Sequence, residues 1–225
     1  MPVRSLVILL CLITLTVACT PQAPDPYAQL SVAELDNLVE AELDNENFSN
    51  AADIYAHIVR LEPDNPDRYR RHGEILSAAS RWDESVDTYR NALKHFPASE
   101  PRIPDIARDL ALTYAIPLQE VDKAERLLDL IPADRQLDRL DLQAVFAALR
   151  NDPRGALKLL YQASQLVDTT AAAARIDFHS ALAYHQLGQE ENLYKALFQA
   201  VTYSEHLGLS RMIADFWFEI GGGTQ

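Results

Sequence analysis

The residues best suited to catalysis or metal binding are six histidines, and their spacing favours neither role. His179 and His185 lie six positions apart on one expected helix and point in different directions, whereas an i, i+4 pair converges on one metal ion. The others fall on separate expected helices without a companion ligand nearby in the sequence: His57, His72, His95 and His206. The sequence therefore predicts no metal site and no catalytic histidine.

Enzyme fingerprints are also missing from the sequence, which has no Walker phosphate loop, dinucleotide-binding glycine pattern, zinc-protease histidine pair or serine-nucleophile elbow. Residues 44–50 (DNENFSN) superficially resemble a calcium loop, but they lack the glycine at the sixth position and the distant glutamate. We interpret them as a turn, because Asn and Asp accept turn geometry and cap helices. We expect no enzyme activity and no cofactor. The alternative, an enzyme or metal carrier on a helical scaffold, would need polar side chains that converge in one pocket.

One cysteine stands at the end of an apolar run. Arg4 precedes residues 5–18, which are apolar and end in a small alanine directly before Cys19. This is the pattern of a cleavable secretory signal, and it is short for a membrane span, which needs roughly 20 apolar residues. Residues 15–18 and Cys19 (LTVAC) resemble the lipobox of bacterial lipoproteins, although Thr16 stands where leucine is commonest. An ordinary signal cut near the same point and an uncleaved short anchor are the alternatives.

The lipobox resemblance implies that the signal peptide, residues 1–18, is removed and that Cys19 is acylated on its thiol and its new amine. Several acyl chains hold a protein firmly, at about 0.8 kcal/mol per buried methylene. Residues 19–30 would then form the lipidated cysteine and a proline-rich tether. In that family an aspartate after the cysteine favours the inner membrane, and Thr20 stands here, so we expect the periplasmic face of the outer membrane. Cys11 leaves with the signal, which suits an oxidising periplasm.

The charge of the chain limits its partners. The formal net charge is −13, and removing Arg4 with the signal makes it −14. The carboxylates are spread along the chain, so the surface repels nucleic acid and anionic lipid headgroups. We therefore expect contact with the membrane only through the lipid, and no nucleic-acid partner.

A period of about 34 residues organises the remainder of the chain. Pro63 and Pro97 lie 34 positions apart in similar contexts. Three columns of small or apolar residues stay in step through five units: Ala51, Ser85, Ala124, Ala156 and Leu193; Tyr55, Tyr89, Leu128, Leu160 and Leu197; Ile58, Ala92, Ile131, Ala163 and Ala200. A fourth column marks where two helices would cross closely: Gly73, Ala111, Ala144 and Ala181. The pattern resembles the tetratricopeptide repeat, a helical hairpin of about 34 residues.

The repeat resemblance implies an all-α fold, an α-solenoid of about five hairpins over residues 31–206. The expected helix pairs are 31–44 and 47–62, 66–79 and 82–96, 102–116 and 119–130, 136–150 and 153–167, and 171–187 and 190–206. A further helix, residues 207–220, carries an apolar stripe of Leu209, Met212, Ile213, Phe216, Trp217 and Ile220. We expect this helix to cap the exposed end of the last repeat and residues 221–225 to form a flexible tail. The alternative for the stripe is partner binding.

In the tetratricopeptide family the first helices of successive repeats line a concave groove that binds proteins. The repeat register places these residues in the expected groove: Arg70, Arg71, Glu74, Arg108, Leu112, Val145, Leu149, Phe178, Leu182 and His185. The groove would be charged at its start and apolar at its end. Arg70 and Arg71 would hold an acidic group of the partner, or would pair with neighbouring carboxylates on a solvated face.

These features together predict a lipid-anchored adaptor that holds a protein partner and assists assembly of an envelope complex. Among bacterial lipoproteins the chain resembles the pilotin type that assists secretins and pili, including the repeat lipoprotein of Tad pilus systems. The alternatives are accessory lipoproteins of outer-membrane barrel assembly, exopolysaccharide export or peptidoglycan synthesis. Fold alone does not choose among them.

Overall fold

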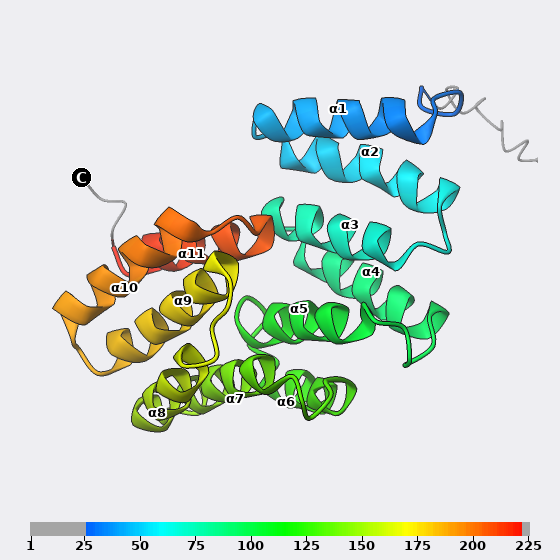
Figure 1. The fold of residues 1–225 in the computed structure, drawn as a ribbon. Helices are drawn as coiled ribbons and strands as arrows, with labels where there is room; N and C mark the ends of the chain where they lie inside the picture. Colours follow the sequence, from blue (N-terminus) through cyan, green and yellow to red (C-terminus); the bar gives the residue numbers. More distant parts are fainter. Residues whose placement is uncertain (1–25, 222–225) are drawn as a thin grey trace, which may run out of the picture.

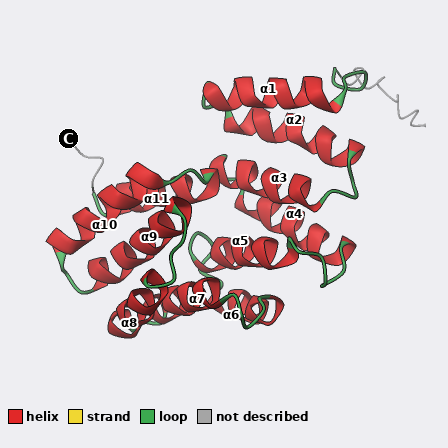
Figure 2. Ribbon diagram, viewed as in Figure 1, coloured by secondary structure: helices red, strands yellow, loops and turns green. Residues whose placement is uncertain are grey.

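The computed structural model describes residues 26–221, and every regular element in that part of the chain is a helix (Figures 1 and 2). Consecutive helices pair into five hairpins: α1 (Val32–Asp44) with α2 (Phe48–Leu61), α3 (Pro66–Ala78) with α4 (Trp82–His95), α5 (Ile103–Ala115) with α6 (Val121–Glu125) and the 3₁₀ helix η1 (Arg126–Leu130), α7 (Gln136–Leu149) with α8 (Pro153–Ser164), and α9 (Thr170–Gln186) with α10 (Glu190–Tyr203). A last helix, α11 (Leu207–Glu219), follows. The predicted all-α solenoid of five hairpins is confirmed.

The turn inside each hairpin has the same backbone conformation. The residue two positions before the second helix has a positive φ in all five units: Glu46, Ser80, Gln119, Asn151 and Gly188. The next backbone N–H donates back into the first helix, as the Asn47 N–H does to the Glu42 carbonyl at 2.8 Å. A left-handed residue after a helix is a common way to satisfy its last carbonyls. The repeated turn therefore fixes the register that the sequence columns indicated.

The third hairpin departs from the expected continuous helix over residues 119–130, because α6 gives way to η1. The Arg139 side chain of α7 donates to the carbonyls of Leu128 and Ile131, both at 2.7 Å. Helix ends leave carbonyls without intrahelical partners, and a tightened 3₁₀ turn with an external donor satisfies them. The packing of α7 thus stabilises the irregular end of this unit.

The small-residue columns pack as predicted. The residues of the first column lie in the interior of each hairpin. A Cβ atom built at Gly73 would lie 2.3 Å from the Tyr89 ring, so a larger residue would force α3 and α4 apart. Helix crossing at this point therefore requires glycine.

The last helix differs from the expected end cap. Helix α11 begins beside α3 (Figure 1) and packs chiefly against that helix. It makes little contact with α10. A Cβ atom at Gly208 would lie 3.1 Å from the Cβ atom of Ser77, and Leu207 packs on the core of the first hairpins. Four residues of the apolar stripe are buried in the interior of the array: Leu209, Met212, Ile213 and Phe216. The C-terminal helix therefore links the last hairpin to the second.

Some sequence predictions concern residues outside the described part of the chain, including the signal peptide, Cys19 and most of the tail. Within the described residues, no helix combines the length and the apolar character that a membrane crossing requires.

Candidate functional site

The charged part of the expected groove is an array of ion pairs. The Arg70 side chain contacts Glu74 at 2.9 Å and Asp109 at 2.8 Å, and Arg71 contacts Glu74 at 3.2 Å and Glu40 at 3.8 Å. This is the alternative that the sequence left open, in which the arginines pair with carboxylates of the chain itself. Glu74 is buried, so its carboxylate is committed to these contacts.

The apolar part of the expected groove is filled by the protein. Leu112, Val145 and Phe178 are buried in the main core, so the expectation that they face an open groove was wrong. The Phe178 ring lies 6.0 Å from the ring of Phe216 on α11, the helix that enters this space. Two expected residues, Leu149 and Leu182, are half-buried against the same core.

His185 is the exception among the expected groove residues, because it is exposed. Its ring lies 5.5 Å from that of Phe216 in an edge-to-face arrangement. The concave side therefore carries α11 where the sequence placed a partner.

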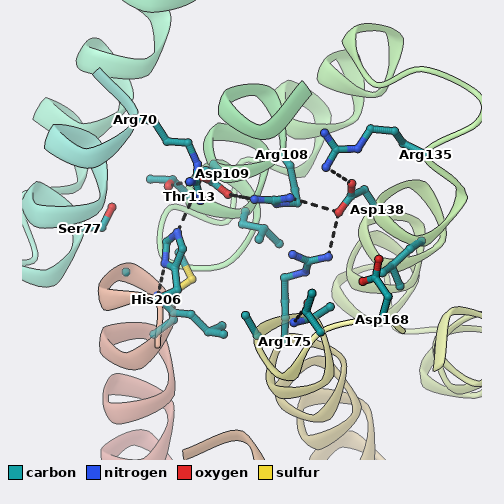
Figure 3. A pocket seen from close by; sticks show the side chains of 18 of the residues that line it. Arg70, Ser77, Arg108, Asp109, Thr113, Arg135, Asp138, Asp168, Arg175 and His206 are labelled. Carbon is teal, nitrogen blue, oxygen red and sulfur yellow. Dashed lines mark hydrogen bonds and ion pairs between the residues drawn. The ribbon is translucent and has the colours of Figure 1, made fainter. Parts of the chain in front are cut away.

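A buried ionic network connects α5, α7 and α9 beside α11 (Figure 3). At its centre Arg108 contacts Asp109 at 2.9 Å and Asp138 at 3.3 Å. Arg175 bridges Asp138 at 2.9 Å and Asp141 at 2.5 Å. Each of these carboxylates is buried and each has an arginine partner, as buried charges require.

The two most deeply placed carboxylates have pKa values below their usual range. Burial alone would raise the pKa of Asp109, but Arg108 and Arg70 hold it well below the ordinary aspartate value. Burial likewise opposes ionisation of Asp141, and contacts from His179 and Arg175 lower its pKa to about 2. Both side chains are therefore anions at neutral pH and hold their cations in place.

The network forms the wall of a cavity of about 540 Å³ between α3, α5, α7, α9 and α11. Four arginines line it, and each of them is paired with a carboxylate: Arg70, Arg108, Arg135 and Arg175. The lining is therefore polar but not strongly cationic. Its positive groups are already neutralised by the chain, which gives an anionic ligand little to gain.

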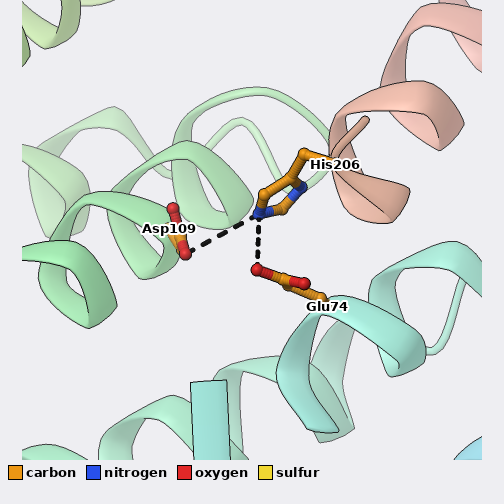
Figure 4. Close-up of side chains that lie close together, drawn as sticks. All are labelled: Glu74, Asp109 and His206. Carbon is orange, nitrogen blue, oxygen red and sulfur yellow. Dashed lines mark ion pairs between the residues drawn. The ribbon is translucent and has the colours of Figure 1, made fainter. Parts of the chain in front are cut away.

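His206, at the start of α11, completes this region from the other side (Figure 4). Its Nε2 atom lies 3.0 Å from Glu74 Oε1 and 3.7 Å from Asp109 Oδ2. When the ring is neutral, its Nδ1 atom accepts a hydrogen bond from the Leu209 backbone N–H at 3.2 Å and caps α11, a bond that the charged ring cannot accept because its Nδ1 carries a proton. Burial would lower the pKa of His206, but the two carboxylates raise it to about 9. His206 therefore fastens α11 to α3 and α5.

Glu74, Asp109 and His206 are of the types that bind metals, and their nearest atoms lie within 4.8 Å of one another. Two observations favour an ion-pair cluster instead. Arg70 already contacts both carboxylates. In the neutral ring, Nδ1 accepts the hydrogen bond from the Leu209 N–H, so the ring proton is on Nε2. In the charged ring Nε2 also carries a proton. In both states Nε2 therefore has no lone pair for a metal ion.

The sequence did not reveal this cluster, because its three members lie on three helices that are distant along the chain. Glu74 and Arg108 were placed in the groove one by one, and His206 was set aside because no companion ligand is nearby in the sequence. The register did place Glu74 of α3 and Arg108 of α5 on the inner face, but it did not single out Asp109.

An apolar groove lies on the outer side, between α10 and α11. Large exposed side chains line it on both helices: Tyr194, Phe198 and Val201 from α10, and Trp217 and Phe218 from α11. Leu197 and Ile213 form its buried floor. The groove encloses about 610 Å³ and is walled almost wholly by apolar atoms. The sequence analysis assigned Trp217 to the stripe of the last helix and did not single out Phe198 or Val201.

The comparisons with known proteins concern the fold. No protein-family model matches the chain, and a search of the curated proteins gives no match. A solved tetratricopeptide repeat protein from Parabacteroides merdae is similar, with a TM-score of 0.58 and 15% identity over 87% of this chain and 75% of that one. A second, YrrB, described as a TPR protein with an unusual peptide-binding site, has a TM-score of 0.43 and 14% identity over 80% of this chain and 90% of that one. The chain is thus an all-helical solenoid of tetratricopeptide-like architecture.

Proposed function

We propose that this chain is a lipid-anchored scaffold that holds a protein partner at the periplasmic face of the outer membrane. In this role it would assist assembly of an envelope complex such as a secretin, a pilus or a secretion system. The anchor is supported by the lipobox-like residues before Cys19, and the scaffold by the helical array. The pilotin-like and Tad-type assignment is supported by the resemblance described above. We propose no enzyme activity, because the polar residues that converge in the interior neutralise one another.

The observation that carries the proposal is the apolar groove between α10 and α11. A chain with a formal net charge of −13 exposes five large apolar side chains together at one end. Contiguous exposed apolar surface of this kind marks an interaction site far more often than single exposed residues do. We therefore place the partner in this groove, because α11 occupies the concave side where the sequence analysis had placed it.

Site-specific photo-crosslinking in living cells tests both parts of the proposal. A photoreactive amino acid at position 198 should give an adduct whose second component is identified by mass spectrometry as a protein of an envelope complex. The matched control is position 161, because Tyr161 occupies the same register on α8 and is 70% exposed, against 74% for Phe198. Combining position 198 with Cys19→Ala should move the chain from the membrane fraction to the soluble fraction.

Equal adducts from positions 161 and 198 would contradict the assignment of the groove. Continued membrane retention of the Cys19→Ala chain would favour the uncleaved short anchor, the alternative given by the sequence, over the lipid anchor. The two outcomes are independent, so the experiment separates the scaffold from its anchor.

A further inference from the structure

The outer face of α10 lacks the covering helix that α2, α4 and α8 have. In those hairpins α3 packs closely on α2, α5 on α4 and α9 on α8, whereas α11 makes only slight contact with α10, as α7 does with the short helix α6. The exposed fraction of the residue that follows the first-column position shows this difference. Ala52 of α2 is 0% exposed and Val86 of α4 is 6% exposed, but Tyr194 of α10 is 47% exposed. Leu157, the equivalent on α8, is half-buried.

The next helix in the chain is present but has been diverted. Helix α11 starts after a short connection, and His206 at its start is held by Glu74 of α3 and Asp109 of α5. In a regular array this helix would stack on α10 as the first helix of a sixth repeat. Because α11 instead runs along α3, the stacking face of α10 becomes one wall of the apolar groove, and α11 becomes the other wall.

The groove has the shape of a helix-binding site. Its α10 wall carries residues at i, i+3, i+4 and i+7: Tyr194, Leu197, Phe198 and Val201. Its α11 wall carries Ile213, Ala214, Trp217 and Phe218 at similar spacing. Two such helical walls accept the single apolar face of a third helix, in the mode by which amphipathic helices enter grooves.

Charge decides between a foreign helix and a second copy of the chain. Glu190 and Glu191 stand one turn before Tyr194, and Glu219 follows Phe218 directly, all three exposed. Lys195 is the cation of α10, and it is exposed outside the groove lining. Arg211 of α11 is paired with Asp215 at 2.8 Å. The Tyr194 and Trp217 rings lie 5.9 Å apart, so the start of α10 meets the end of α11 and the three glutamates gather at one end of the groove. A second copy would bring the same acidic cluster, whereas a helix with a basic flank would complement it.

We infer that the groove between α10 and α11 binds one amphipathic helix of the partner protein, in the place of the first helix of a sixth repeat. The apolar face of that helix lies on Tyr194, Phe198 and Trp217, and its basic flank lies beside the glutamates that gather at one end of the groove. This inference rests on the proposed function, because it names the kind of partner that the scaffold holds.

The test uses the full mature chain with Cys19→Ala, which needs no detergent, and synthetic peptides of roughly 16 residues, about four helical turns. One fluorescent peptide carries Leu and Ile at i, i+3, i+4 and i+7 with Lys on its flanks. A second has the same apolar face with Glu in place of Lys, and a third has two central prolines. Fluorescence anisotropy should show the basic peptide binding about tenfold more tightly than the acidic one, and more weakly as salt rises.

Variants locate the binding. Phe198→Glu should weaken binding of the basic peptide by about tenfold or more, and Tyr161→Glu should leave it unchanged. Circular dichroism checks that both variants remain helical. Equal binding of the basic and acidic peptides, or undiminished binding of the proline peptide, would overturn the inference. A concentration-dependent dimer that Phe198→Glu dissolves would also overturn it, since a second copy would then be the occupant.

The inference and the proposed function can fail separately. If none of the peptides binds while position 198 still crosslinks an envelope protein in cells, the helix inference is wrong and the scaffold remains. If no peptide binds and position 198 gives no crosslink, the helix inference and the groove assignment are both wrong.

Discussion

Asp109→Ala is expected to lower the free energy of unfolding by about 3–5 kcal/mol, the range for breaking a buried ion pair by removing one partner. The substitution leaves Arg70, Arg108 and His206 facing one another without the carboxylate that they share. Arg108 is buried, so its charge cannot be solvated in compensation. Urea unfolding followed by circular dichroism measures the loss.

The matched control is Asp87→Ala. Asp87 is exposed, and its ion pair with Arg90 has a distance of 3.9 Å. Exposed pairs of this kind contribute about 0–1 kcal/mol, so the control should barely change the unfolding midpoint. Equal effects of the two substitutions would show that the interior network does not hold the helices together.

Phe178→Ala should cost about 3–5 kcal/mol of unfolding free energy, as expected when a buried phenylalanine is truncated and leaves a cavity. The side chain is fully buried in the main core and packs against Phe216 of α11. Removing it therefore loosens both α9 and the helix that fills the concave side. Thermal and urea unfolding of the purified chain measure the change.

Phe198→Ala is the control for this substitution, because Phe198 is largely exposed and its truncation should change stability by less than about 0.5 kcal/mol. The pair also separates two interpretations of Phe178. If Phe178 faced a partner, as the sequence predicted, its truncation would leave the isolated protein as stable as the control does.

The helical array was predictable because its signals are local. A column such as Ala51 and Ser85 repeats whenever one hairpin stacks on the next, and it can be recognised without knowing which hairpins touch. The left-handed turns were less visible. Gly188 and Asn151 are of types that favour a positive φ, whereas Glu46, Ser80 and Gln119 adopt it because the helix end requires it.

The course of α11 could not be predicted from the sequence. Its apolar stripe indicated a buried face, which is confirmed for Leu209, Met212, Ile213 and Phe216. What the stripe cannot indicate is the helix that covers it. The packing of α11 on α3 depends on the ion pairs of His206 with Glu74 and Asp109. Ion pairs between residues so far apart in the sequence produce no periodic pattern that could be recognised. The open groove on α10 is a consequence of the same packing.

The central claim is that α11 packs on α3 and not on α10, and an engineered disulfide between α3 and α11 tests this packing most directly. In the mature chain with Cys19→Ala, Ser77→Cys and Gly208→Cys place the only two thiols on α3 and α11. A Cβ atom at position 208 lies 3.1 Å from the Cβ atom of Ser77, near the roughly 3.5–4.5 Å that a disulfide spans. Mild oxidation should form the bond within the monomer, seen as a mobility shift without reducing agent that the single-cysteine variants lack. A folded double variant that keeps both thiols free would contradict the account, because α11 would then lie away from α3.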